Sequence, residues 1–228
     1  MNFKITSLPI FADNFQYIIH NDKNSVVVDP GDAEVLFLFH HKHKLIPQAI
    51  LLTHFHDDHM AGLAELMNHF PDLKIYGSSH IKECKWTIQS QKDITLLNDL
   101  NCQMIATPGH AREHVIFYFQ QLELAFTGDL IFHLGCGRVF DGTMEELYQS
   151  LQLLKELPSS TKLYCSHDYG LRNQEFCKSL LSHAFDYSSY PQLHQIPLDL
   201  ATEINWNPFL MAKSYENFVE LRKRRNQF

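Results

Sequence analysis

At residues 49–59 the chain reads Ala49-Ile50-Leu51-Leu52-Thr53-His54-Phe55-His56-Asp57-Asp58-His59. Its first four residues form a short, fully apolar run, which is typical of a strand buried within a sheet. On extended backbone His54 and His56 point the same way, and the turn that follows brings Asp58 and His59 back toward them. Imidazole and carboxylate groups at this spacing suit a divalent cation. The stretch therefore predicts a metal site at the end of a buried strand.

Three more metal-capable residues follow predicted strands in the same way. His110 comes after a strand at 102–106, Asp129 after one at 124–126, and His167 after one at 162–165. Because α/β sheets commonly place their sites just beyond strand ends, we expect these residues to join the first cluster. A catalytic ion needs about three protein ligands, so seven candidates predict two ions that share a carboxylate. Such a pair can activate a water molecule held between them.

The remaining pattern predicts an α/β protein with a helical end. Further strands are expected at 17–20, 25–29, 74–76 and 115–119, and helices at 33–44, 63–69, 143–157, 173–185 and 214–225. The helix at 143–157 opens with a capping box formed by Thr143 and Glu146. Residues 186–208 contain three prolines and read as irregular. We therefore predict an α/β domain over residues 1–170 and a mainly helical extension over residues 171–228.

Composition narrows the class of protein. The 228 residues are 45% hydrophobic and 20% charged, which is typical of a soluble globular chain. The net charge of -7 gives no sign of a nucleic-acid-binding surface. Five scattered cysteines favour reduced thiols in a cytoplasmic protein. No signal peptide or membrane span is expected, because polar residues interrupt the start and no apolar run approaches about 20 residues.

Together these motifs resemble the metallo-β-lactamase superfamily and, within it, the glyoxalase II (hydroxyacylglutathione hydrolase) family. The wider resemblance rests on the metal-capable residues described above. The narrower one rests on the stretch Gly128–Thr143, in which Gly135-Cys136-Gly137-Arg138-Val139-Phe140-Asp141-Gly142-Thr143 follows the aspartate. His167-Asp168-Tyr169, Asn207-Pro208-Phe209-Leu210 and the basic end of the chain also match, so the resemblance spans nearly the whole sequence.

The resemblance implies an αββα sandwich followed by a small helical domain that helps to bind glutathione. One metal site would consist of His54, His56 and His110. The other would consist of Asp58, His59 and His167, and Asp129 would bridge the two. Asp58 and Asp129 would act with a metal-bound hydroxide in catalysis. The implied substrate contacts are Arg138, Phe140, Tyr169, Arg222 and Arg225.

The implied reaction is hydrolysis of S-D-lactoylglutathione, or another 2-hydroxyacylglutathione, to glutathione and a 2-hydroxy acid. This is the second step of methylglyoxal detoxification. We expect two divalent ions, with zinc ahead of iron or manganese, in a cytoplasmic monomer without nucleic-acid or membrane partners. Arg222 and Arg225 are spaced i, i+3, so they share a helix face and could reach one carboxylate; the alternative is a favourable interaction with the C-terminal end of the helix dipole.

The chain departs from the family pattern at a few positions. The usual Gly-His-Thr-x-Gly-His becomes Gly109-His110-Ala111-Arg112-Glu113-His114, which keeps the ligand but changes the loop. Asp168 stands where glutamate is common, and Phe140 where tyrosine is frequent. Met211 takes a place that often holds a basic residue, and residues 177–206 look shorter than usual, which would reshape the acyl side of the pocket.

Several other readings remain open. A glutathione persulfide dioxygenase would use one iron and fewer ligands. A β-lactam hydrolase would not need the helical extension and the basic C-terminus. A nuclease would be expected to carry a larger basic surface, and a metal-binding module would have no turnover. Among the remaining side chains, we expect His114 to pack beside the site, His40, His41 and His43 to lie on a surface helix, and Cys136 to serve packing rather than nucleophilic chemistry.

Overall fold

The computed structural model describes residues 3–87, 92–180 and 186–228. The chain divides into two compact units: the first comprises Met1–Ala106 with Glu113–Leu122, and the second comprises Thr107–Arg112 with Glu123–Phe228. This division does not coincide with the boundary expected at residue 170. The helical extension falls in the same unit as the Gly128–Thr143 stretch. The division into a catalytic domain and a helical domain stays a prediction.

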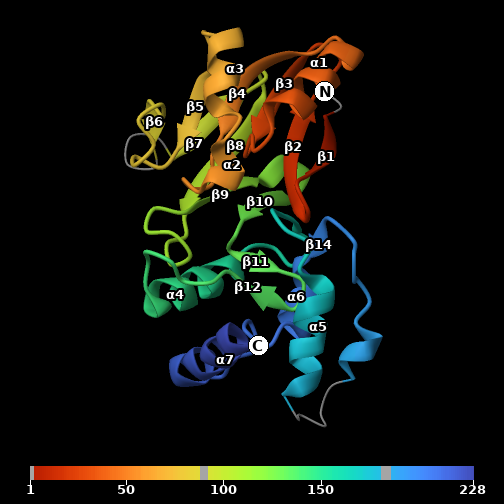
Figure 1. The fold of residues 1–228 in the computed structure, drawn as a ribbon, viewed down its shortest axis with the longest axis vertical. Coiled ribbons are helices and arrows are strands. Elements are labelled where there is room, and N and C mark those ends of the chain that lie inside the picture. The colour runs from red at the N-terminus through yellow and green to blue at the C-terminus, as the bar shows by residue number, and fades with distance from the viewer. Residues whose placement is uncertain (1–2, 88–91, 181–185) are drawn as a thin grey trace. The chain divides into compact units, whose positions relative to one another are not determined.

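The first unit is built on a sheet with the strand order β1-β2-β3-β4-β5-β6 (Figure 1). Strands β1 to β3 pair antiparallel, and β3 to β6 run parallel. The strands are β1 (Lys4–Ile10), β2 (Asn14–His20), β3 (Asn24–Val28), β4 (Ile46–Leu51), β5 (Lys74–Gly77) and β6 (Trp86–Thr87). The parallel part explains why β3 and β4 read as continuous apolar runs, because such strands are covered on both faces.

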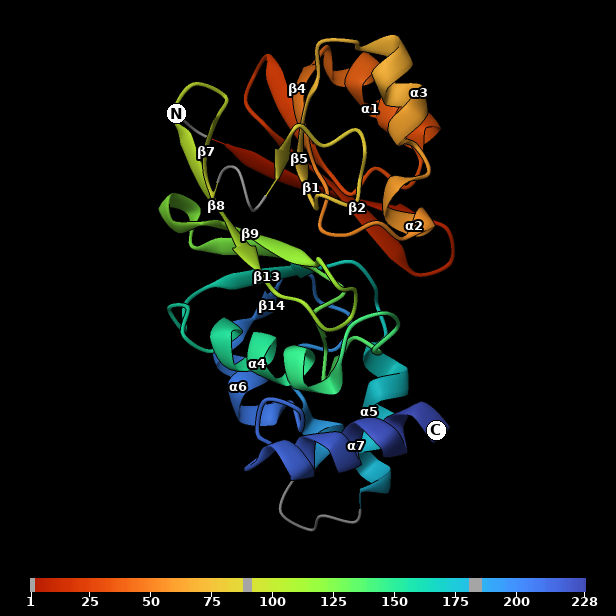
Figure 2. The ribbon, with the colours of Figure 1, turned by 90° about the vertical axis from the view of Figure 1, so that its left-hand side faces the viewer.

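Helices α1 (Ala33–His43) and α3 (Leu63–His69) lie along one face of this sheet (Figure 2). Their apolar side chains Leu36, Leu63 and Leu66 are fully buried against Val27 and Ile50 of the central strands. A one-turn helix, α2 (Asp57–Met60), carries the Asp-Asp-His stretch, and five residues separate it from Leu51, the last residue of β4. The burial of β4 thus anchors the segment that bears the first four candidate ligands.

The first unit also contains the antiparallel strands β7 (Asp93–Leu96), β8 (Leu100–Ala106) and β9 (Val115–Phe119), followed by the short helix η1 (Gln120–Leu122). Alternate residues of β8 are buried, as expected of an antiparallel strand with one covered face. The loop that carries His110 leaves the end of β8, so this pairing sets where that loop starts.

The second unit has the strand order β14-β13-β10, with β10 (Leu124–Gly128) parallel to β13 (Lys162–Cys165) and β14 (Leu198–Asp199) at the edge. A small hairpin, β11 (Ile131–Phe132) and β12 (Gly135–Cys136), follows β10. The helices are α4 (Met144–Leu154), α5 (Gly170–Ser179), η2 (Tyr187–Ser189), α6 (Leu200–Trp206) and α7 (Tyr215–Gln227). The predicted capping box of Thr143 and Glu146 is present at the start of α4.

One element contradicts the sequence-based expectation. Residues 186–208 were predicted to be irregular, but they contain the helix α6. Pro197 precedes this helix and Pro208 follows it, so neither proline interrupts it. Leu200 and Glu203 form its buried face. The predicted helix at 173–185 begins earlier, at Gly170, and its last five residues lie outside the described part of the chain.

Among the described residues, the structure has no helix long and apolar enough to cross a membrane.

Candidate active site

Four candidate ligands of the first unit leave the buried end of β4. His54 and His59 are 0% and 1% exposed, whereas His56 and Asp58 are partly exposed. His54 Nε2 lies 3.0 Å from His56 Nδ1, and His59 Nε2 lies 3.6 Å from Asp58 Oδ2. Alternation on extended backbone predicted the first pair, and the second pair lies on α2, directly after the turn.

Asp29 orders this group, and sequence reading missed its role. It follows β3, the parallel neighbour of β4, and it is buried. Its carboxylate accepts hydrogen bonds from Thr53 N at 2.8 Å and Thr53 Oγ1 at 2.7 Å, and it lies 3.1 Å from His59 Nδ1. A carboxylate on one imidazole nitrogen turns the other toward a metal. The missed signal was an acidic residue directly after a buried strand, the same feature that identified Asp129.

We expect Asp29→Asn to weaken zinc binding about 10–100-fold, the usual effect of removing a carboxylate that orients a ligating histidine. An amide in place of Oδ2 would turn a donor toward Thr53 Oγ1 and His59 Nδ1. Competition titration against a chromophoric chelator measures the affinity. Asp32→Asn is the matched control, because Asp32 caps α1 through an oxygen that asparagine retains. Equal zinc affinity in Asp29→Asn and the wild type would contradict this role.

Asn14, the first residue of β2, holds Asp58, the remaining candidate ligand of this group. Its Nδ2 donates to Asp58 Oδ2 at 2.8 Å. Gly31 packs closely against the backbone of Asp58, since a Cβ built at Gly31 would stand 2.3 Å from the carbonyl oxygen of Asp58. Asp58 is therefore positioned both through its side chain and through its backbone.

The second unit contributes three candidate ligands from the ends of other elements. Asp129 follows β10, His167 follows β13, and His110 lies in the segment Thr107–Arg112. His110 Nε2 lies 3.4 Å from Asp129 Oδ2, and His167 Nε2 lies 3.5 Å from Asp129 Oδ1. Two ligand atoms about 2.1 Å from one tetrahedral ion stand about 3.4 Å apart. The spacing therefore fits one metal on each carboxylate oxygen of Asp129.

The two candidate histidine ligands of the second unit, His110 and His167, are each held on the side of the ring away from Asp129. His110 Nδ1 donates to the carbonyl oxygen of Arg138 at 2.8 Å, which leaves Nε2 directed at Asp129. His167 stacks on Tyr169 with a centroid distance of 4.7 Å, and the edge of Phe132 meets it at 5.8 Å. A backbone carbonyl on the other nitrogen, as at His110, is a partner expected of a ligating imidazole.

Gly137 permits the close packing of this corner. A Cβ built on it would lie 2.1 Å from the carbonyl oxygen of Asp129 and 3.0 Å from His110 Nδ1. Gly109, which precedes the ligand His110, has a φ of +133°, and a Cβ there would collide with Leu147 at 2.3 Å. Gly137 thus lets the backbone of the Gly128–Thr143 stretch lie directly against two candidate ligands.

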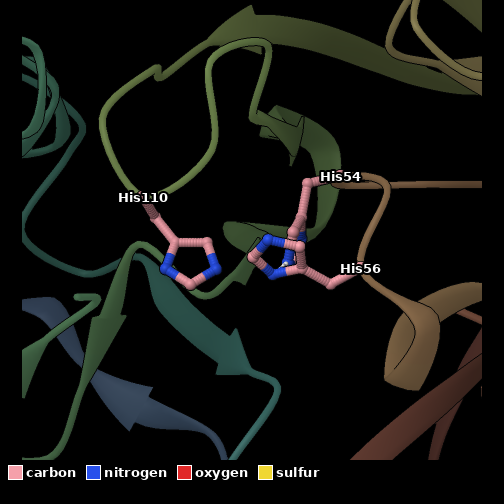
Figure 3. A group of neighbouring side chains, drawn as sticks. All are labelled: His54, His56 and His110. Carbon is pink, nitrogen blue, oxygen red and sulfur yellow. Dashed lines mark hydrogen bonds between the residues drawn. The ribbon is translucent and has the colours of Figure 1, made fainter. Parts of the chain in front are cut away.

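All seven predicted metal ligands belong to groups that could hold an ion. Within each group the ligand atoms lie within 4.8 Å of one another. The groups are His54 with His56 and His110, His54 with His59 and Asp129, and Asp58 with His59 and His167. Figure 3 shows the rings of the first group turned toward one another. Imidazole nitrogens with a few carboxylate oxygens form a donor set that fits a divalent metal such as zinc.

The residues predicted to contact substrate differ in exposure. Arg138 and Phe140 are exposed, with the guanidinium 6.0 Å from the ring centroid, and Tyr169 is half-buried. Arg222 is buried, and its Nη1 donates to the carbonyl oxygen of Cys136 at 2.7 Å. Arg225 Nε donates to Asn173 Oδ1 at 2.9 Å, and burial lowers the pKa of its guanidinium to about 10. The two helix arginines thus bind the protein itself in this structure.

The remaining candidates were mostly predicted correctly. Cys136 is buried, and burial raises the pKa of its thiol, which makes it a poor nucleophile. His114 is fully buried beside the site, with its ring centroid 5.1 Å from that of His54. His40, His41 and His43 lie on α1 as predicted, but the side chain of His40 faces the core, where it is 4% exposed and bonded to Ser25 Oγ and the Leu36 carbonyl. Burial lowers its pKa, so it serves as a neutral core side chain.

The chain is similar in sequence to known proteins over its whole length. The profile of the Metallo-beta-lactamase superfamily matches residues 12–167. A hydroxyacylglutathione hydrolase of Haemophilus ducreyi is 35% identical over 99% of both chains. One from Bdellovibrio bacteriovorus is 37% identical over 96% of both chains.

The fold also has solved counterparts. The crystal structure of ETHE1 from Myxococcus xanthus superposes with a TM-score of 0.77 at 23% identity, covering 98% of this chain and 90% of that one. At that identity the likeness establishes the fold, which is the predicted α/β fold of the metallo-β-lactamases. The full-length sequence relatives go further: the chain belongs to the metallo-beta-lactamase superfamily and, within it, to the hydroxyacylglutathione hydrolase family.

Proposed function

We propose that the protein is a metal-dependent thioesterase that hydrolyses S-D-lactoylglutathione, or a related 2-hydroxyacylglutathione, to glutathione and the free acid. The observation that carries the proposal is Asp129, whose two oxygens lie 3.4 and 3.5 Å from different histidines. That arrangement suits a carboxylate shared by two ions. The relatives named hydroxyacylglutathione hydrolase supply the substrate class.

Two divalent ions, zinc by preference and iron or manganese as alternatives, would be held by the seven predicted ligands. We assign His54, His56 and His110 to one ion, Asp58, His59 and His167 to the other, and Asp129 to both. When bound, such ions lower the pKa of water and polarise a carbonyl group. The protein's part is to hold the ligands rigidly: Asp29 orients His59, Asn14 holds Asp58, and the Arg138 carbonyl orients His110.

Thioester chemistry needs no dedicated proton donor for the leaving group. A thiol with a pKa near 8.5 departs readily as a thiolate. Cys136 is unsuited to covalent catalysis because it is buried and its pKa is raised. The reaction therefore depends on the ligand set, and the 2-hydroxy acid and glutathione leave without an enzyme-bound acyl group.

Glutathione carries carboxylates at both ends, so its binding calls for cationic and aromatic groups at the surface. Arg138 and Phe140 provide them, since both are exposed and lie beside each other, with His110 5.3 Å from the Phe140 ring. We propose these two residues and Tyr169 as direct contacts. For Arg222 and Arg225 we propose a role through the residues they hold, Cys136 and Asn173, with Arg225 half-exposed and able to reach a ligand as well.

We expect Arg138→Ala to raise KM for S-D-lactoylglutathione about 10-fold while kcat changes less than about 2-fold, because one charge-assisted contact is worth about 1.4 kcal/mol or more. Lys223→Ala, an exposed cation on α7, serves as the control and should leave KM unchanged. Steady-state kinetics at fixed ionic strength measure both. An unchanged KM in Arg138→Ala would remove Arg138 from the substrate contacts.

The proposal is tested against its rivals with a substrate panel. Purified zinc-loaded protein is assayed with S-D-lactoylglutathione, with a lactoyl thioester that lacks the γ-glutamyl and glycyl groups of glutathione, and with a chromogenic β-lactam. Oxygen consumption with glutathione persulfide is measured on iron-loaded protein. We expect hydrolysis of the glutathione thioester to exceed the others by at least about 10²-fold in kcat/KM. Oxygen uptake without thioester hydrolysis would replace the thioesterase with the dioxygenase. The cytoplasmic location and monomeric state stay predictions.

A further inference from the structure

The turn between β11 and β12 has a conformation that its own sequence does not favour. Phe132 pairs with Gly135, so His133 and Leu134 form a two-residue connection. Leu134 has a φ of +56°, a value at which turns normally place glycine or asparagine. Leucine is strained there because its Cβ crowds the backbone. Something outside the hairpin must stabilise this turn.

The backbone groups of the turn are bonded by side chains that come from far along the chain. Asn173 Nδ2 donates to the His133 carbonyl at 2.9 Å, and Cys177 Sγ lies 3.6 Å from the Leu134 carbonyl. Asn207 Nδ2 lies 3.2 Å from the Phe132 carbonyl and 2.9 Å from that of Gly135. Helix α5 and the end of α6 therefore clasp the hairpin, which explains why the helical extension and the signature stretch form one compact unit.

Glu203 is the acidic member of this clasp and the one that binds the strained residue. It is 0% exposed on α6, and its Oε2 accepts the N–H of Leu134 at 3.0 Å and Asn207 Nδ2 at 2.8 Å. Its other oxygen accepts a short hydrogen bond from the hydroxyl of Tyr190. Burial raises the pKa of Glu203 to about 7, although these three donors favour the ionised form. A buried carboxylate is costly and stabilises less than apolar packing would, so a positioning role is a reason to have one.

The β11–β12 hairpin links these hydrogen bonds to His167, a proposed metal ligand. Phe132, which ends β11, meets His167 edge-on at 5.8 Å and Tyr169 at 5.0 Å. By holding the turn, Glu203 thus fixes the position of the Phe132 ring, which packs against His167. Packing behind a ligating imidazole fixes its direction, and sub-ångström placement of ligands governs affinity and rate.

We propose that Glu203 is a positioning residue of the second metal site: by binding the Leu134 N–H it holds the β11–β12 turn, and through Phe132 it fixes His167. The metal assignment rests on the proposed function, but the contact with Leu134 does not. Glu203 has no role in binding substrate, and Tyr190 only completes the hydrogen bonding of its far oxygen.

Three substitutions separate positioning from simple stabilisation. Glu203→Ala removes the acceptor of the Leu134 N–H. Glu203→Gln keeps an amide oxygen that can face Leu134 and Asn207, so it is the conservative replacement. Tyr190→Phe is the matched control, because it removes a hydrogen bond from the same carboxylate but leaves the oxygen that faces Leu134.

The hydrogen-exchange rate of the Leu134 amide, followed by NMR, measures directly whether the turn is held. We expect protection in the wild type, Tyr190→Phe and Glu203→Gln, and at least about 10-fold faster exchange in Glu203→Ala. Zinc titration should show one of the two sites losing about 10–100-fold in affinity in Glu203→Ala alone, with kcat falling in parallel. Tyr190→Phe should lower the melting temperature without changing zinc affinity.

Wild-type exchange and zinc affinity in Glu203→Ala would overturn the proposal, as would equal losses of zinc affinity in Tyr190→Phe. If Glu203→Ala does not fold, Glu203→Asp takes its place, since it keeps the charge but withdraws the carboxylate from Leu134; retained zinc affinity in that variant would also overturn the proposal. If the wild type hydrolyses no thioester, the proposed function fails, and the exchange and zinc measurements still decide the role of Glu203.

Discussion

Asp129→Ala is expected to lower kcat/KM for S-D-lactoylglutathione by at least about 10³-fold. Asp129 is buried, and each of its oxygens lies beside a different histidine, His110 and His167. Removing its carboxylate takes one ligand from each proposed ion. It also removes the group that lies beside both the His110 and the His167 rings. Loss of the charge stabilisation that two metals supply corresponds to several kcal/mol, and about 4 kcal/mol is a factor of about 10³.

The matched control is Asp57→Ala. Asp57 lies within the ligand-bearing stretch, but it is exposed and belongs to none of the metal groups found among the described residues. We expect it to retain activity within about 3-fold. Metal content by mass spectrometry should fall below two ions per chain in Asp129→Ala and stay at two in Asp57→Ala. Full activity in Asp129→Ala would exclude a shared carboxylate from the reaction.

Gly137→Ala is expected to reduce kcat at least about 10²-fold in a protein that still folds. The added methyl group would stand 2.1 Å from the Asp129 carbonyl and about as close to the His110 ring as a Cβ ever comes, at 3.0 Å. The backbone must move, and it carries Arg138, whose carbonyl orients His110. A displacement of about 1 Å in a reacting constellation costs on the order of 10²-fold in rate.

Val139→Ala is the control for this substitution, since it lies in the same loop and removes atoms instead of adding them. We expect it to keep kcat within about 3-fold. Circular dichroism and thermal melting confirm that both variants fold, and zinc titration shows whether His110 and Asp129 still bind together. A Gly137→Ala protein with wild-type kcat and zinc affinity would show that the loop has more room than the structure gives it.

The candidate metal ligands could be picked out from the sequence because they depend on local pattern. Each comes shortly after a strand that the sequence pattern predicts: β4, β8, β10 or β13. The predicted strands Val115–Phe119 and Lys162–Cys165 are confirmed with the same bounds, and the predicted strand Ala49–Leu52 lies within β4 up to Leu51. The capping box at Thr143 was equally local, and it appears as predicted.

The residues that hold the ligands were not predictable, because their roles depend on long-range contacts. Asp29 reads as the stop of a strand until Thr53 and His59 are seen beside it. Glu203 lies between prolines in a short helix, and its partner Leu134 is 69 residues away. The shared face of Arg222 and Arg225 suggested one carboxylate ligand, whereas the two side chains bind separate groups of the protein.

The central claim is tested most directly by hydrolysis of S-D-lactoylglutathione with protein stripped by a chelator, dialysed, and then titrated with zinc. We predict no measurable activity in the stripped protein and a return of rapid hydrolysis that reaches its plateau at two zinc ions per chain. Full activity without metal would contradict the account, and so would zinc-loaded protein that binds two ions and leaves the thioester intact.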